Sequence, residues 1–158
     1  MRGSPTAPVT GCFSLADVSS VTDPEIRGFL MEGTRTGKLS YLAADGRPLV
    51  VPVWFVIDDG CLVFNTGKDS AKGRSLARDP RASICVDLER QPYAFVQVQG
   101  VAEISEDPAD VLATATSIAS RYVGAAQAQE YGRRNAAPGE LVVRLRPRKV
   151  IASFDVTG

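Results

Sequence analysis

A glycine turn that leads into a basic, hydroxyl-rich helix is the stretch of this chain whose residue types could bind a charged ligand. It reads Asn65-Thr66-Gly67-Lys68-Asp69-Ser70-Ala71-Lys72-Gly73-Arg74-Ser75-Leu76. A helix N-terminus presents unpaired backbone N–H groups and the positive end of the helix dipole, and both favour a phosphate group. Thr66, Ser70 and Lys72 could add direct contacts. The pattern predicts a phosphate site, and the alternative is a solvated basic helix that caps itself with Asp69 or Ser70.

The charge of this stretch differs from that of the whole chain. Between residues 65 and 81 the basic side chains are Lys68, Lys72, Arg74, Arg78 and Arg81, and the acidic ones are Asp69 and Asp79. The chain as a whole has 18 basic and 18 acidic residues and a formal net charge of zero. Nucleic-acid-binding domains usually carry a basic excess, so the balance argues against a nucleic-acid partner, and it gives no reason to expect an anionic membrane surface.

The residue types also limit the chemistry. The chain contains no histidine, which removes histidine metal sites, Ser-His-Asp triads and Cys-His pairs. Cys12, Cys61 and Cys85 are odd in number and fit no metal motif, so we expect no metal and reduced thiols in a cytoplasmic protein. Any reaction is therefore expected to depend on a bound cofactor, and we assign no catalytic residue.

The elements that would position these residues are mostly strands. The periodicities and turn signals predict helices over residues 23–32, 69–78 and 107–124, and strands over 38–43, 47–58, 61–66, 81–88, 93–104 and 141–154, the last interrupted at Pro147. This pattern predicts a mainly β fold, a closed or nearly closed antiparallel barrel with peripheral helices.

The strand predicted over residues 47–58 contains Pro52 within an apolar run. Proline cannot donate to a sheet ladder, so it belongs at an edge or a bulge. A locally unpaired backbone beside Trp54 could receive a flat heterocycle, whereas the pattern alone favours an edge strand with Trp54 in the core. Tyr93 and Phe95, at the start of the strand over 93–104, could stack on a ring or fill a dimer interface.

The first 20 residues are rich in Ser, Thr, Pro and Gly. They lack the basic and apolar blocks of a signal peptide, and no run in the chain is long and apolar enough to span a bilayer. We therefore expect residues 1–20 to be a flexible N-terminal arm and residues 21–158 to form one cofactor-binding barrel domain.

Several of these segments together resemble a known family. They are Val50-Val51-Pro52-Val53-Trp54-Phe55, Ser70-Ala71-Lys72-Gly73-Arg74-Ser75-Leu76, Arg78-Asp79-Pro80-Arg81 and Phe95-Val96-Gln97-Val98-Gln99-Gly100. In this order they resemble the pyridoxamine 5′-phosphate oxidase-like split β-barrel group, and more narrowly its actinobacterial branch that uses the deazaflavin F420. The resemblance implies a six-stranded antiparallel split β-barrel of the FMN-binding type, and a homodimer with two cofactor sites at the subunit interface.

The resemblance also implies roles for individual residues. Lys72 would bind the cofactor phosphate with Ser70 and Arg74 nearby, and Lys68 is the alternative, because relatives often have arginine where Ser70 stands. The remaining cofactor-binding residues would be Asn65 and Thr66 in the same pocket, Val51, Pro52, Val53 and Trp54 along the ring system, and Tyr93, with Phe95 as a further candidate, from the partner subunit.

Three functions follow as hypotheses. The first is an F420-dependent oxidoreductase that transfers a hydride between reduced F420 and a small organic acceptor. The second is an FMN-dependent oxidoreductase on the same barrel; a further basic groove, for which Arg47, Arg78 and Arg81 are candidates, would favour F420 with its oligoglutamate tail. The third is a non-catalytic flavin- or deazaflavin-binding carrier. Pyridoxamine-phosphate oxidase activity itself is disfavoured because the paired Arg and His of those enzymes' C-terminal segment are not found.

Overall fold

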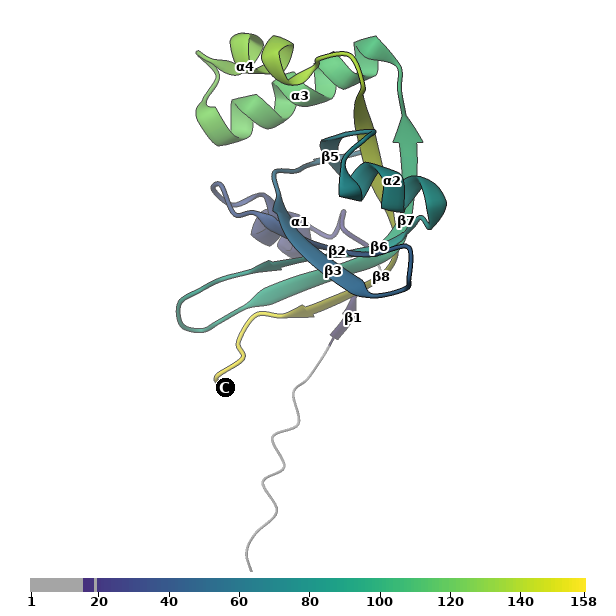
Figure 1. Cartoon of the computed structure of the whole chain (residues 1–158). Coiled ribbons are helices and arrows are strands. Elements are labelled where there is room, and N and C mark those ends of the chain that lie inside the picture. The colour runs from purple at the N-terminus through teal and green to yellow at the C-terminus, as the bar shows by residue number, and fades with distance from the viewer. Residues whose placement is uncertain (1–15, 19) are drawn as a thin grey trace, which may run out of the picture.

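One antiparallel sheet of eight strands organises the chain in the computed structural model, which describes residues 16–18 and 20–158 (Figure 1). The strands are β1 (Ala16–Val18), β2 (Gly37–Leu42), β3 (Pro48–Val53), β4 (Val56–Asp58), β5 (Cys61–Gly67), β6 (Arg81–Asp87), β7 (Phe95–Ser105) and β8 (Glu140–Ser153). Their order is β3-β2-β6-β7-β8-β5-β4, and β1 pairs with β8. Because β3 and β4 end this path without pairing to each other, the barrel is split between them.

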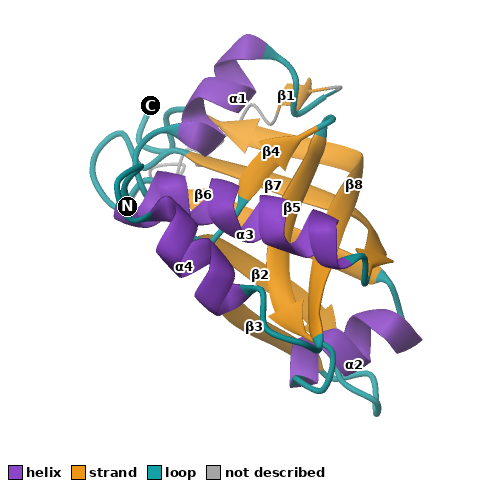
Figure 2. Ribbon diagram, turned by 90° about the horizontal axis from the view of Figure 1, so that it is seen from above, coloured by secondary structure: helices purple, strands orange, loops and turns teal. Residues whose placement is uncertain are grey.

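Four helices accompany the sheet in the described part of the chain: α1 (Pro24–Met31), α2 (Ala71–Arg78), α3 (Pro108–Val123) and α4 (Ala128–Asn135). The helices α3 and α4 lie together across one side of the strands, and α2 lies at one end of the sheet (Figure 2). No helix among residues 16–18 and 20–158 is long and apolar enough to cross a membrane.

The mainly β split-barrel fold is confirmed, but the expected number of six strands is wrong. The strand predicted over residues 47–58 breaks after Val53, because β3 pairs with β2 whereas β4 pairs with β5 on the other side of the split. An uninterrupted apolar run gives no local signal for such a corner. The eighth strand is β1, which lies within the predicted N-terminal arm; residues 1–15 and 19 lie outside the described part.

Pro147 does not interrupt β8, contrary to expectation. Pro147 lies opposite Gly100, where the β7–β8 register shifts, so the irregularity absorbs the missing donor. A side chain at Gly100 would collide with the chain beside it, since a Cβ there would lie 2.2 Å from the carbonyl oxygen of Arg146. The strand therefore continues through the proline to Ser153.

The core fills the inside of the barrel. Its largest fully buried side chains include Phe55, Phe64, Leu39, Ile84 and Leu145. A second, smaller cluster lies under α3 and includes Val63, Val111 and Ile118. These two clusters hold the β5 strand between the barrel interior and α3, which places one end of β5 beside the split.

Candidate functional site

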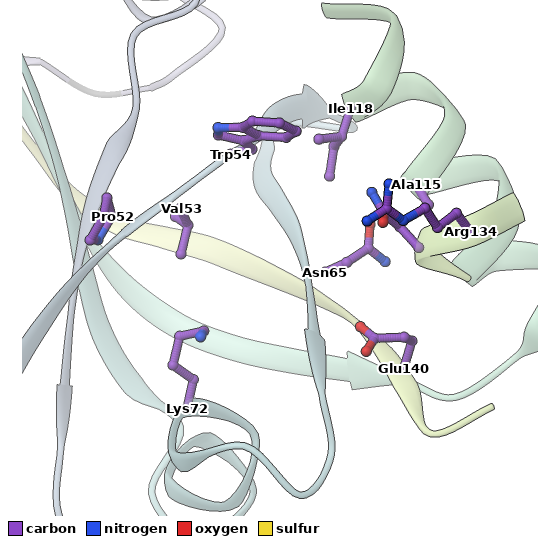
Figure 3. Close-up of a pocket in the computed structure, with 10 residues that line it drawn as sticks. Pro52, Val53, Trp54, Asn65, Lys72, Ala115, Ile118, Arg134 and Glu140 are labelled. Carbon is purple, nitrogen blue, oxygen red and sulfur yellow. The ribbon is translucent and has the colours of Figure 1, made fainter. Parts of the chain in front are cut away.

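A cavity of about 420 Å³ opens at the split, between β3 and β5, and α3 and α4 border it (Figure 3). Its lining residues come from six parts of the chain: Pro52 and Val53 of β3, Trp54 after it, Asn65 of β5, Lys72 of α2, Ala115 and Ile118 of α3, Arg134 and Asn135 of α4, and Glu140 of β8. Apolar side chains form one part of the wall, and charged and amide groups form the other.

Lys72 reaches this cavity from the first turn of α2. The helix begins at Ser70, whose hydroxyl oxygen accepts a hydrogen bond from the Gly73 N–H at 3.0 Å, and the Thr66 hydroxyl lies 2.9 Å from it. The helix start is pressed onto the end of β5, because a Cβ at Gly73 would lie 2.3 Å from the Gly67 carbonyl oxygen. The glycine thus allows the approach that aims Lys72 at the cavity.

Glu140 brings a carboxylate into the same cavity. It pairs with Gly67 across β5 and β8, so it stands next to the turn that leads into α2. Burial raises the pKa of Glu140 above its usual 4.5, and the positive charge of Lys72 opposes that rise. The polar end of the cavity therefore holds a cation and an anion close to each other.

Asn65 presents a defined face to the cavity. Its amide nitrogen Nδ2 donates to the Leu141 carbonyl at 3.1 Å, which fixes the orientation of the carboxamide. The oxygen Oδ1 is then the atom left to interact with a ligand, so Asn65 can accept a hydrogen bond from a hydroxyl or an N–H group.

Trp54 forms the apolar wall at the other end. Its side chain is 42% exposed, so the expectation of a core tryptophan is wrong, and the buried residue of this corner is Phe55. The indole stacks on Tyr122 of α3, which covers one face of the ring. The expectation of an edge strand at Pro52 is confirmed, because among the described strands β3 pairs only with β2.

The cavity unites five of the residues that the sequence analysis singled out, namely Pro52, Val53, Trp54, Asn65 and Lys72. The other six lie elsewhere: Val51 packs against the barrel core, Thr66 is buried, Ser70 caps α2, Lys68 lies beside Gly139, Arg74 donates to the Asp69 carbonyl, and Tyr93 is exposed in the loop between β6 and β7.

The three arginines considered for an additional basic groove have other partners. Arg47 and Arg81 form ion pairs with Asp45 and Asp79, and Arg78 donates to the Leu42 carbonyl. None of them lines the cavity at the split.

The last third of the chain contributes cavity residues that local sequence patterns do not indicate. Arg134, Asn135 and Glu140 were not singled out, and α4 was not predicted because its buried residues, Ala128 and Gly132, make no hydrophobic stripe. Ile118 lies in the helix predicted over residues 107–124, and nothing local in the sequence indicates that it borders a cavity.

A split antiparallel barrel with a mixed apolar and cationic pocket at its split is the class that this fold and site define. The chain belongs to the pyridoxamine 5′-phosphate oxidase family, whose sequence pattern matches residues 22–154. This is a family of flavin-binding oxidoreductases, so the expected resemblance is confirmed at that level.

Two curated relatives are named pyridoxine/pyridoxamine 5′-phosphate oxidase, from Cupriavidus taiwanensis and Cupriavidus necator. Each is 34% identical over 121 residues, which cover 73% of this chain and 53% of the relative. The chain thus spans about half the length of these relatives.

Two solved structures are also similar. A conserved hypothetical protein from Mycobacterium tuberculosis has a TM-score of 0.72 and 28% identity, with 85% of this chain and 84% of that chain covered. A structure described as an F420 reductase has a TM-score of 0.64 and 25% identity, with 78% of this chain and 94% of that chain covered.

Proposed function

We propose that this protein is an F420-dependent oxidoreductase that transfers a hydride between the reduced deazaflavin and a small organic acceptor. The observation that carries the proposal is the cavity at the split, where Lys72 from a helix N-terminal turn lies opposite an apolar wall that includes Trp54. A cation opposite an apolar wall suits a flat, tricyclic cofactor that carries a phosphate. The family of flavin-binding oxidoreductases and the F420 reductase among similar structures support it.

The residues present fit such a cofactor. Lys72 would hold the phosphate, aided by the positive end of the α2 dipole. Pro52, Val53 and Trp54 would lie along the ring system, and Asn65 Oδ1 would accept a hydrogen bond from a hydroxyl or N–H group of the cofactor. The cofactor, when bound, would supply the hydride chemistry, and the apolar side chains would exclude water and orient the acceptor.

FMN is the second candidate cofactor, and the family membership favours it. FMN and F420 share a tricyclic ring and a ribityl phosphate, so Lys72 and Trp54 would serve either. Carboxylates on the oligoglutamate tail distinguish F420, and the second cation of the cavity, Arg134, fits such groups. The presence of Arg134 at the cavity is the reason why we propose F420 in preference to FMN.

We further propose that the protein acts as a homodimer, and that Tyr93 reaches the pocket of the partner subunit. Ser40, Ser83, Gln97 and Gln99 line a hollow on the face of β2, β6 and β7, together with Arg148 and neighbouring residues. Tyr93 is 48% exposed and does not line the pocket of its own chain. A second copy of the chain on this face would cover the hollow. Sedimentation equilibrium of wild-type protein tests the homodimer, and a monomeric mass would contradict it.

The cofactor proposal is tested by titrating purified protein with F420 and, separately, with FMN. Trp54 is the only tryptophan of the chain, so its fluorescence reports on occupancy of this cavity. Quenching that saturates at a lower concentration of F420 than of FMN supports the proposal that the protein binds F420. The reverse order assigns the protein to FMN, and no quenching by either cofactor overturns the proposal of a flavin or deazaflavin site.

Bound cofactor alone does not distinguish an enzyme from a carrier. With reduced F420 bound, the absorbance of the oxidised deazaflavin should return when unsaturated acceptors are added under anaerobic conditions. If the bound reduced cofactor is not oxidised by a broad set of quinones and unsaturated carbonyl compounds, the hypothesis of a non-catalytic carrier is favoured.

A further inference from the structure

Arg134 gives the cavity a second positive charge on a different element from Lys72. It belongs to α4, and its side chain points from that helix toward Asn65 (Figure 3). Within residues 20–158, its interaction is a contact with the Tyr131 ring, 5.8 Å from the ring centroid, and it has no hydrogen bond or ion pair there. A guanidinium that borders this cavity and has no hydrogen-bond acceptor among these residues can bind an acceptor group of a ligand.

Most other arginines of the described chain differ in this respect. Arg144 and Arg146 form two-point contacts with Asp110 and Glu103, and Arg121 donates to three backbone carbonyls. These groups have hydrogen-bond or ion-pair partners, whereas Arg134 has neither within the described residues.

The ordinary role of a basic residue here would be to complement the negative end of the α4 dipole. Arg133 serves that role equally well, since both arginines lie in the last turn of the helix. Arg133, however, lines a separate small hollow with Leu112, Thr116 and Gln129. The dipole therefore does not explain why Arg134 lies at the larger cavity, and Arg133 provides a matched control.

The packing of α4 aims Arg134 at the cavity. At Gly132 the helix approaches α3 so closely that a Cβ would lie 2.2 Å from the Thr116 hydroxyl oxygen and 2.9 Å from the Thr116 Cα. Ala128 is also buried in this contact region. Small residues thus set α4 against α3, and Arg134, two positions after Gly132, is held at the cavity rim.

We propose that Arg134 is a carboxylate-binding residue of this cavity and selects ligands that carry a carboxylate over their neutral analogues. A guanidinium presents two parallel N–H groups that match a carboxylate, whereas Lys72 offers a point charge better suited to a phosphate. Glu140 interacts electrostatically with Lys72, whereas Arg134 forms no ion pair with a carboxylate among residues 20–158. The inference deepens the proposed function, because the carboxylate can belong to the acceptor or to the tail of F420.

The acceptor arm of the test needs no cofactor. Unloaded protein is titrated with cinnamate and with cinnamamide, which differ in charge but share a planar frame, and Trp54 fluorescence is followed. We expect wild-type protein and Arg133→Gln to prefer cinnamate, and Arg134→Gln to lose roughly tenfold in cinnamate affinity, the scale of one charge-assisted contact. Lys72→Gln should keep the preference for cinnamate. Circular dichroism checks that each variant is folded.

The cofactor arm compares F420 and FMN on the same variants. A loss in Arg134→Gln for F420 but not FMN assigns the carboxylate to the cofactor tail, and a loss for cinnamate alone assigns it to the acceptor. Unchanged cinnamate and F420 affinities in Arg134→Gln, or an equal loss for cinnamamide, overturn the proposal. If neither cofactor binds while the cinnamate preference depends on Arg134, the proposed function fails and the carboxylate site stands.

Discussion

The indole of Trp54 lies flat against the phenol ring of Tyr122, with ring centroids 4.9 Å apart and planes 3° from parallel. The Tyr122 hydroxyl also accepts a hydrogen bond from the Phe55 N–H at 3.2 Å and donates to the Arg35 carbonyl at 2.8 Å. One side chain of α3 therefore supports the cavity wall by stacking and the chain corner after β3 by hydrogen bonding.

These two functions of Tyr122 can be separated by substitution. Tyr122→Phe keeps the ring against Trp54 but leaves the Phe55 N–H without its acceptor, so we expect a loss of about 1–2 kcal/mol in the free energy of unfolding. Tyr122→Leu also removes the stack and should weaken cofactor binding further. Urea denaturation and the F420 titration measure the two effects. Equal stability of Tyr122→Phe and wild-type protein would contradict the role of the hydroxyl.

Arg121, the preceding residue, links the same corner to α1. It donates to the carbonyls of Leu30 at 2.8 Å, Gly33 at 3.1 Å and Phe55 at 2.7 Å. Burial lowers the pKa of its guanidinium, so the three carbonyls offset a real cost of desolvation. Arg121→Met should lose about 2–3 kcal/mol of unfolding free energy, because it leaves these carbonyls without the donor. Arg133→Gln, on exposed α4 surface, is the control, and a similar loss in both would refute the linkage.

Local patterns in the sequence were sufficient for the parts of the site that depend on neighbours along the chain. Pro52 indicated an edge strand, and β3 does pair with β2 alone within the part of the chain that the structure describes. The glycine turn and polar residues after Asn65 predicted a helix start, and Lys72 does lie in its first turn. Each of these properties is decided within a few residues by backbone geometry.

The rest of the site depends on contacts between distant segments. Glu140 meets the α2 turn only because β8 pairs with β5, and Arg134 meets the cavity only because Gly132 lets α4 press on α3. The exposure of Trp54 follows from the strand break after Val53, and no residue in this apolar run indicates that break. Small residues and long-range pairing leave no periodic signal, so these features required the structure.

The close contact at Gly132 gives a prediction for the α3–α4 pair. Gly132→Ala places a Cβ in the space of Thr116, which should shift α4 and cost about 1–3 kcal/mol of unfolding free energy. The shift should also reduce the cinnamate preference, because Arg134 is on the moved helix. Gly28→Ala in α1 is the matched control, since a Cβ there has no atom within 4 Å, and it should stabilise the protein by about 0.5–1 kcal/mol. Equal effects of the two substitutions would contradict the close-packing account.

Lys72 gives a prediction for phosphate binding. Lys72→Ala should weaken binding of F420 and FMN by about 1.5–3 kcal/mol, the scale of a lost hydrogen bond to a charged group, and leave the fold intact. The comparison variant is Lys68→Ala, which changes an exposed lysine that does not line the cavity. Unchanged cofactor affinity in Lys72→Ala would remove the phosphate-site assignment, and a loss only in Lys68→Ala would transfer it to Lys68.

Glu140 gives the cavity a dependence on pH. Because burial raises its pKa above 4.5, the folded protein holds this proton more tightly than the unfolded chain does. Protonated Glu140 therefore contributes to the free energy of unfolding at a pH below its pKa in the unfolded chain. This contribution is lost as the pH rises through the Glu140 pKa of the folded protein. Above the folded pKa the carboxylate is ionised, and its negative charge then repels a phosphate placed on Lys72.

Glu140→Gln removes both the pH-dependent contribution to stability and the repulsion of a phosphate at Lys72. At a pH above the folded pKa of Glu140 we expect this variant to be more stable than wild-type protein and to bind FMN more tightly. The two proteins should converge as the pH falls through the Glu140 pKa, since the wild-type carboxyl then becomes neutral. The phosphate of FMN also titrates, near pH ~6, but it does so equally in both titrations, so the ratio of the two affinities isolates Glu140. A ratio that stays constant from neutral to acidic pH would show that Glu140 does not act on the ligand at Lys72.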